Sequence, residues 1–253
     1  ALFNAISFNG NEGIKFIDKN TDEITTTFKI EEGYETHFLL ETKNKEFLTF
    51  STSTDGASSK IFVFDEDLNK KTEMISEDEY RIFKAVEVKG NKIITKDTSL
   101  HLCLWNLSDY ILMGTILLER ESDVYVRPFK MFYFEDSNTL LCEDEKSIKV
   151  IDIDLFQIIN TIQINYFIED VDVVLGLDDG NFIIGHLYGD YLCSYNENGH
   201  FNYYFNKIKT SNKKGEIKDY DEGSFQILTS IALGQNNQFL IGNRAGDILI
   251  WEY

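Results

Sequence analysis

Short apolar strands separated by polar turns recur along the whole chain, and no segment shows a helical period. The clearest of them reads apolar, variable, apolar, then apolar or aromatic, and ends in an acid or an amide; we call it the signature strand. A short apolar run of this kind, bounded by turn residues, predicts a β-strand. Six copies occur at intervals of 41 to 56 residues. They are Ile14–Asp18, Ile61–Asp65, Leu102–Asn106, Ile148–Asp152, Leu192–Asn196 and Ile248–Glu252.

The surroundings of the signature strand repeat as well. A second apolar strand precedes each of the last five copies, and a turn containing asparagine precedes that strand in turn (Asn44, Asn91, Asn138, Asn181 and Asn237). Because asparagine tolerates left-handed backbone angles, we expect tight hairpins at these turns. A longer apolar strand lies upstream, and a more polar fourth strand follows the signature strand, as in Ile24–Ile30, Ile111–Leu118 and Gln157–Ile164.

Four short strands joined by hairpins form an antiparallel meander that cannot bury both of its faces alone. Stacking such units radially buries both faces and leaves only short edges exposed. The sequence therefore predicts an all-β fold, a β-propeller of about six, or seven, four-stranded antiparallel blades. Residues 1–253 are expected to form a single propeller domain or part of a larger propeller. Ala1–Phe8 fits a second or third strand, so we expect the first blade to lack its inner strand and the last its outer one.

The repeats resemble those of the WD40 family. Trp105–Asn106 and Trp251–Glu252 are similar to the dipeptide that ends the family's repeats, and Arg244–Trp251 is similar to its turn and strand. The resemblance implies a WD40-like propeller that serves as a platform for other proteins. The chain departs from the family pattern because no Gly-His pair precedes an innermost strand. The family's His-Asp-Ser-Trp hydrogen-bonded tetrad therefore cannot be traced in the sequence.

The formal charge of −19 restricts the classes of partner that the chain is expected to bind. Such a field repels nucleic acid and anionic membrane surfaces, and it favours a basic protein partner. The three cysteines have no CxxC spacing, which predicts buried thiols and a cytoplasmic location, with nuclear and cytoskeletal sites left open. Residues 210–223 form a polar insertion that we expect to be a mobile loop.

Candidate chemistry is sparse. The four histidines lie far apart, without metal-ligand spacing, and no phosphate loop or nucleophile motif occurs. Asp178–Asn181 resembles half a calcium loop but is expected to be a plain turn. We therefore expect no catalytic residue, no metal, no cofactor and no small-molecule substrate.

The predicted connections between blades are acidic and carry an aromatic residue close by. In a propeller these connections emerge on one face, so we expect an acidic rim with aromatic anchors that binds a Lys/Arg-bearing segment of a partner. The alternative is that the aromatics wedge between blades and the acids face solvent. The candidate partner-binding residues are Glu32, Tyr34, Glu79, Tyr80, Glu121, Tyr125, Asp170, Tyr220 and Glu222.

The sequence thus predicts a non-catalytic scaffold for protein–protein interactions, a subunit or domain of a larger assembly. The alternative is a propeller enzyme of the hydrolase type with a divalent cation in its channel. The acid and amide content would permit that site, while the signature strands and the lack of a recognisable export signal favour the scaffold.

Overall fold

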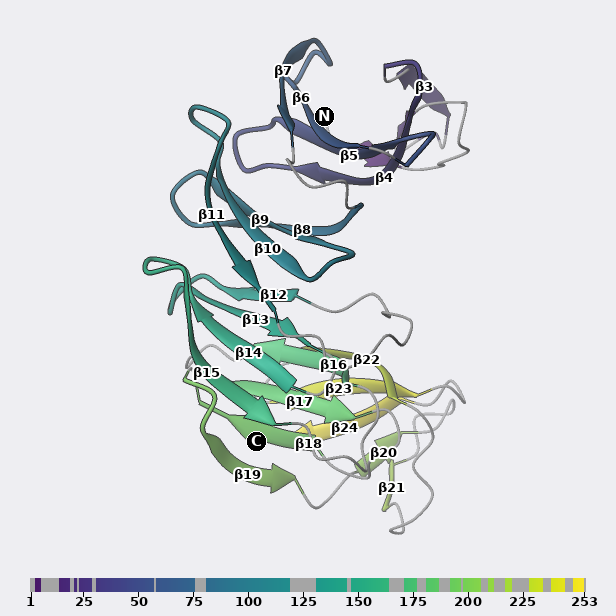
Figure 1. The fold of residues 1–253 in the computed structure, drawn as a ribbon. Coiled ribbons are helices and arrows are strands. Elements are labelled where there is room, and N and C mark those ends of the chain that lie inside the picture. Colours follow the sequence, from purple (N-terminus) through teal and green to yellow (C-terminus); the bar gives the residue numbers. More distant parts are fainter. Residues whose placement is uncertain are drawn as a thin grey trace. The chain divides into compact units, whose positions relative to one another are not determined.

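Every regular element in the described residues of the structure is a β-strand (Figure 1). It is a computed structural model that describes residues 3–5, 14–18, 21, 23–28, 31–56, 58–75, 81–118, 131–144, 147–163, 171–176, 181–186, 192–196, 198–205, 209–211, 217–219, 228–233, 238–243 and 248–252. The chain divides into two compact units, Ala1–Pro128 and Phe129–Tyr253, and each is described by itself. This part of the chain contains no helix that is long and apolar enough to cross a membrane.

In its described residues, the first unit contains three antiparallel sheets in sequence order. Sheet 1 has three strands, β1 (Phe3–Ala5), β2 (Ile14–Asp18) and β3 (Ile24–Phe28). Sheet 2 consists of β4 (Tyr34–Glu41), β5 (Phe47–Ser53), β6 (Ser59–Phe64) and β7 (Lys70–Ile75). Sheet 3 consists of β8 (Ile82–Val88), β9 (Lys92–Asp97), β10 (His101–Asn106) and β11 (Ile111–Leu117).

The described part of the second unit also contains three sheets. Sheet 4 consists of β12 (Met131–Phe134), β13 (Thr139–Glu143), β14 (Ser147–Asp152) and β15 (Gln157–Gln163). Sheet 5 consists of β16 (Val171–Gly176), β17 (Phe182–His186), β18 (Leu192–Tyr195) and β19 (Phe201–Phe205). Sheet 6 has the order β21-β20-β24-β23-β22, with β20 (Lys209–Ser211), β21 (Ile217–Asp219), β22 (Leu228–Leu233), β23 (Gln238–Asn243) and β24 (Ile248–Glu252).

The strand pattern predicted from the sequence is confirmed. All six signature strands form, and in sheets 2 to 5 each is the third strand of a four-stranded meander. Its apolar residues alternate between the two faces of the sheet, as β6 illustrates. Ile61 and Val63 belong to one apolar cluster and Phe62 and Phe64 to another, and all four are buried. A strand buried on both faces reads as a continuous apolar run, which accounts for the signature.

Neighbouring sheets share apolar cores within each unit. In the first unit, Phe50 and Val63 of sheet 2 pack in one cluster with Ile93 and Trp105 of sheet 3. In the second unit, Val150 of sheet 4 packs in one cluster with residues of sheet 5 such as Phe182. Each sheet in these pairs thus buries a face against its neighbour, as the repeat pattern requires.

The third and fourth strands are irregular at the same point in sheets 1 to 5. The register shifts one residue before the last apolar residue of the signature strand, and this leaves one extra residue in the fourth strand. The extra residues are Thr25, Lys71, Met113, Ile159 and Asn202. The bulge is therefore part of the repeat, although its side chain differs from sheet to sheet.

Two predictions about the C-terminal sheet are wrong. The place beside β24 is filled by β20, which pairs Lys209 with Ile250 and Ser211 with Ile248. Residues 210–223 were expected to be a mobile loop, but part of them forms β20 and β21, which pair with each other. The polar sequence of β20 hides this pairing, because backbone groups alone make it. In sheet 1, β1 pairs with the signature strand β2, and the missing inner strand of this blade stays a prediction.

The asparagine turns are confirmed in part. Asn91 and Asn138 adopt left-handed backbone angles, with φ of 56° and 50°. In the turn from β4 to β5 it is Lys45, not Asn44, that adopts the left-handed angle, with φ of 59°. Asn44 instead donates a hydrogen bond to Asn91 of sheet 3, so its side chain serves a contact between sheets.

Candidate protein-interaction surface

The acid or amide that ends the signature strand caps the turn after it. Asp65 Oδ1 accepts hydrogen bonds from the backbone N–H groups of Asp67 at 3.0 Å and Asn69 at 2.8 Å. The bond from the Asn69 backbone contributes most to holding the pKa of Asp65 below its ordinary value. Equivalent caps are made by Asn106, Asp152 and Asn196. This recurrent polar position thus has a structural role in the turn.

The same turns hold bulky residues in the left-handed region. Leu68, Tyr110 and Phe156 have φ of 64°, 59° and 47°. Bulky side chains adopt this conformation rarely and at a cost, so the contacts of the side chain must sustain it. Leu68 packs against the phenylalanine cluster of sheet 2, and Tyr110 reaches that sheet from sheet 3.

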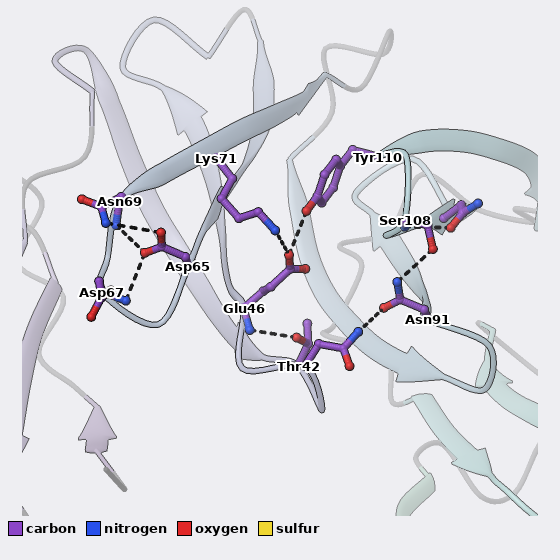
Figure 2. A network of polar contacts seen from close by, with 11 residues as sticks. Thr42, Glu46, Asp65, Asp67, Asn69, Lys71, Asn91, Ser108 and Tyr110 are labelled. Carbon is purple, nitrogen blue, oxygen red and sulfur yellow. Dashed lines mark hydrogen bonds and ion pairs between the residues drawn. The ribbon is translucent and has the colours of Figure 1, made fainter.

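Tyr110 joins sheet 3 to sheet 2 through a shared carboxylate (Figure 2). Its hydroxyl donates to Glu46 Oε1 at 2.8 Å, and Lys71 Nζ binds the same oxygen. The bond to Glu46 is also the main reason why the pKa of Lys71 is raised, while burial raises the pKa of Tyr110. The ammonium group of Lys71 lies 5.5 Å from the centre of the Tyr110 ring. One carboxylate thus holds a cation of sheet 2 and a hydroxyl of sheet 3.

Further polar contacts join the turns of sheet 2 to those of sheet 3. Together with the contacts of Glu46, we call them the polar seam. Asn44 Nδ2 donates to Asn91 Oδ1 at 2.9 Å, and Asn91 Nδ2 donates to Ser108 Oγ at 3.1 Å. The backbone N–H of Lys43 donates to Glu87 Oε2 at 2.8 Å. These bonds fix the packing of sheet 2 on sheet 3, so the polar seam has a structural role.

Sheet 3 contains parts of the tetrad that the sequence did not reveal. The indole Nε1 of Trp105 donates to Thr95 Oγ1 at 2.9 Å. His101 Nδ1 lies 3.1 Å from Asp97 Oδ2, and Asp97 Oδ1 accepts backbone N–H bonds from Ser99 and His101. Three of the four residue types are present in these two pairs, and threonine stands in place of serine. They belong to the β9–β10 hairpin and stabilise it.

Two of the predicted rim residues are described, Glu32 and Tyr34. Glu32 is exposed, and Tyr34 is half-buried at the start of β4. The Tyr34 ring packs edge-on against Phe62 at 5.5 Å, and its hydroxyl lies 3.0 Å from Ser58 Oγ. Lys60 Nζ lies 4.9 Å from the ring centre. Tyr34 is therefore engaged by its own sheet, while Glu32 faces solvent. The remaining candidates lie outside the described residues: Glu79, Tyr80, Glu121, Tyr125, Asp170, Tyr220 and Glu222.

The acid beside Glu32 forms a charge cluster that the sequence did not indicate. Glu31 and Glu73 bind Lys60 and Lys70, with nitrogen–oxygen distances of 2.9 to 3.5 Å. Hydrogen bonds from Lys70 are the largest cause of the lowered pKa of both acids. Within the described ranges, no group of three or more His, Cys, Asp or Glu residues is placed to hold a metal ion.

The fourth strand of sheet 3 exposes several apolar side chains, which the sequence did not indicate. Exposed fractions are 54% for Ile111, 41% for Leu112, 51% for Met113 and 64% for Leu117. β11 lies at the end of its sheet, with β10 on one side. No charged residue occurs between Asp109 and Glu119, although a quarter of the chain is charged. Apolar residues exposed together on one strand are candidates for an interaction surface. We call Ile111, Leu112, Met113 and Leu117 the β11 stripe.

No family model matches the sequence, and no curated protein matches it. Solved structures do match the fold. A chain of the structure titled "Crystal Structure of Mitotic Checkpoint Complex" is 12% identical, with a TM-score of 0.60, covering 96% of this chain and 69% of that chain. A protein of unknown function from Bacteroides caccae is 13% identical, with a TM-score of 0.51, covering 78% of this chain and 75% of that chain.

At these identities the likeness concerns the fold alone. It agrees with the strand order of sheets 2 to 5, in which each four-stranded antiparallel meander corresponds to one blade. The chain is therefore all-β and has a fold of the propeller class, with four-stranded antiparallel blades like those of the matching structures. The predicted fold class is confirmed, while the resemblance to WD40 repeats in particular stays a prediction.

Proposed function

We propose that this chain is a non-catalytic scaffold of the WD40 type that binds other proteins as part of a larger assembly. The β11 stripe is the observation that carries the proposal. The equivalent strand of sheet 2 has Lys70 and Lys71 where β11 exposes Leu112 and Met113, so a folded blade does not need apolar residues at these two positions. Their exposure to water is unfavourable. Burial against a partner protein would offset that cost.

The polar chemistry of the blades supports a structural role for the scaffold. The acids and amides of the signature strands cap turns, and Glu46 holds two sheets together. Cys193 is a buried thiol, and burial raises its pKa to about 11, which keeps it protonated and poorly nucleophilic. None of the three cysteines is in a disulfide, which suits the reducing interior of a cell, and we place the protein in the cytoplasm.

The net charge of −19 indicates the kind of partner. Acidic surfaces speed association with basic proteins and disfavour acidic ones. The exposed Glu32 belongs to the acidic connections that the sequence predicts, and we propose that these connections contribute to the binding of a basic partner.

Affinity capture with matched variants tests the proposal. We would immobilise the wild type, L112K/M113K in β11, and I158K/I159K in β15, and compare the proteins that each retains from an extract of the native source. Ile158 and Ile159 occupy the same positions in sheet 4 as Leu112 and Met113 in sheet 3, and they are 39% and 44% exposed. We expect a protein that the wild type and I158K/I159K retain and that L112K/M113K loses. Retention of the same proteins by all three would contradict the proposed function.

A further inference from the structure

One turn of sheet 5 contains a residue pair with chemistry of its own. The turn between β18 and β19 includes Asn198 followed by Gly199, one of two Asn-Gly pairs in the sequence. Because glycine has no Cβ, its backbone nitrogen can approach the side-chain carbon Cγ of the preceding asparagine and displace the amide nitrogen as ammonia. The succinimide that forms is hydrolysed to aspartate or to isoaspartate. Isoaspartate runs the main chain through the former side chain and lengthens it by one carbon atom.

Asn196 holds the backbone of this turn in place. Its Oδ1 accepts hydrogen bonds from the N–H groups of Asn198 at 3.1 Å and His200 at 2.9 Å. Its backbone oxygen accepts a hydrogen bond from the N–H of Gly199 at 2.8 Å, and Gly199 adopts φ of 76°. Attack on Asn198 requires the Gly199 nitrogen to lose its proton and to turn towards Cγ, so its bond to Asn196 must break first. The closed turn therefore opposes the reaction.

The same turn packs on the neighbouring sheet 4. Asn198 is exposed to water, whereas Gly199 is buried. The backbone oxygen of Asn198 accepts a hydrogen bond from Nδ2 of Asn160 in β15. A Cβ added at Gly199 would lie 2.8 Å from Val150 Cγ2 and 3.1 Å from Ile162 Cδ1, closer than packed side chains tolerate. The packed turn therefore has no room for an additional carbon atom in its main chain.

We propose that Asn198 is a site of spontaneous modification that the closed turn blocks, and that isoaspartate at this position prevents the turn from packing on sheet 4 again. When the turn opens, the Gly199 nitrogen gives its proton to solvent and forms a bond to Cγ of Asn198. The bond from Cγ to Nδ2 breaks, and Nδ2 takes up one proton and leaves as ammonia. Water then adds to the main-chain carbonyl carbon of Asn198, and the bond from that carbon to the Gly199 nitrogen breaks. Isoaspartate results without oxidation or reduction, and no partner protein takes part.

Deamidation rates in the folded protein and in a peptide test whether the turn blocks the reaction. The protein carries N9A, which removes the other Asn-Gly pair, and the peptide has the sequence of residues 195–201. Both are kept in mildly alkaline buffer, and digestion followed by mass spectrometry measures the conversion of Asn198. We expect conversion in the protein to be at least about tenfold slower than in the peptide, and to become faster in low concentrations of urea. Equal rates in protein and peptide, or a rate that urea leaves unchanged, would overturn the proposal.

Matched variants of the capping asparagines show which contacts provide the block. N196A removes the side-chain oxygen that accepts two hydrogen bonds in this turn, whereas N106A removes the equivalent cap in sheet 3. In the N9A background, N196A should speed the conversion of Asn198 about fivefold or more, and N106A should leave it unchanged. Equal rates in these two variants would show that Asn196 does not keep the reactive turn closed, and would overturn the proposal.

The effect of isoaspartate on packing has its own control. N198D has the same charge as the deamidated protein but keeps the normal main chain. After incubation, ion exchange separates the deamidated fraction, and peptide mapping verifies that it is rich in isoaspartate. We expect this fraction to melt at a lower temperature than N198D, because its longer turn no longer fits against Val150 and Ile162. Equal melting temperatures would overturn this part of the proposal.

Discussion

Trp105 donates a buried hydrogen bond of 2.9 Å from its indole Nε1 to Oγ1 of Thr95 in the adjacent strand. Sheet 2 has Phe64 and Thr49 at the equivalent positions, because Phe62 pairs with Thr49 as Cys103 pairs with Thr95. The side chain of phenylalanine has no hydrogen-bond donor. Accordingly, Thr49 Oγ1 is buried and has no hydrogen-bond partner in the structure. Threonine at this equivalent position therefore stabilises sheet 3 by accepting a hydrogen bond, whereas in sheet 2 it buries a hydroxyl group without a partner.

The two threonines should respond oppositely to valine. T95V leaves the indole N–H of Trp105 buried without an acceptor, and it should lower the free energy of unfolding by about 1–3 kcal/mol. T49V removes a hydroxyl that has no partner, so stability should be unchanged or higher. Urea unfolding followed by Trp105 fluorescence, in a W251F background, measures both. An equal loss in the two variants would contradict the assignment.

Loss of the Tyr110 hydroxyl should loosen the polar seam between sheets 2 and 3. Y110F removes the bond to Glu46 and should lower the free energy of unfolding by about 1 kcal/mol. Lys71 binds the same carboxylate oxygen, so Y110F and K71M should be non-additive in a double-mutant cycle. Additive effects would show that the two side chains do not share Glu46 in solution.

Two glycines with left-handed backbone angles should differ in their tolerance of alanine. Gly56 has φ of 75° and no atom within 4 Å of an added Cβ, so G56A should cost about 1–2 kcal/mol of backbone strain. Gly199 has φ of 76°, and an added Cβ would lie 2.8 Å from Val150 Cγ2. G199A should therefore cost about 1–3 kcal/mol more than G56A. Thermal unfolding of both variants measures the difference, and equal melting temperatures would argue against packing of this turn on sheet 4.

His37 should make the first unit less stable in mild acid. Burial, and next the charge of Arg81, lowers the pKa of His37 below its ordinary value of about 6.5. The folded state therefore binds the proton less readily than the unfolded chain does. Its contribution to stability is present above about pH 6.5 and is lost as the pH falls through the lower folded pKa. Urea unfolding between about pH 7.5 and pH 5 should show a smaller decline for H37Q than for the wild type. Parallel declines would exclude His37 as a cause.

The strands could be predicted from the sequence because their signal is local. A continuous run of apolar residues over a few positions specifies a strand buried on both faces, and β6 and β10 follow it. The capping acids were visible as part of the same pattern, although their bonds to turn N–H groups are seen only in the structure. The sequence repeat therefore consists of the apolar run and the capping residue that each blade needs for its own folding.

Features that depend on pairing between distant segments could not be predicted. β20 pairs with β24 through backbone groups that every residue pair of this kind has, so the sequence of Lys209–Ser211 shows no apolar pattern that would predict the pairing. Glu46 and Tyr110 are far apart in the chain, and only the packing of two sheets brings them together. The rim prediction rested on acids near aromatic residues, and Tyr34 shows the weakness of that reasoning, since its ring packs on Phe62 of its own sheet. From the sequence, the β11 stripe could not be told from an ordinary fourth strand, because a run of apolar residues does not show whether their side chains are exposed.

Hydrogen exchange of the protein with and without its captured native partner tests the central claim that β11 is the docking strand. Backbone amides of residues 111–117 should exchange more slowly in the complex, while those of Lys70–Ile75, the equivalent strand of sheet 2, should keep their rates. Unchanged exchange in residues 111–117, with protection confined to other segments, would contradict the account.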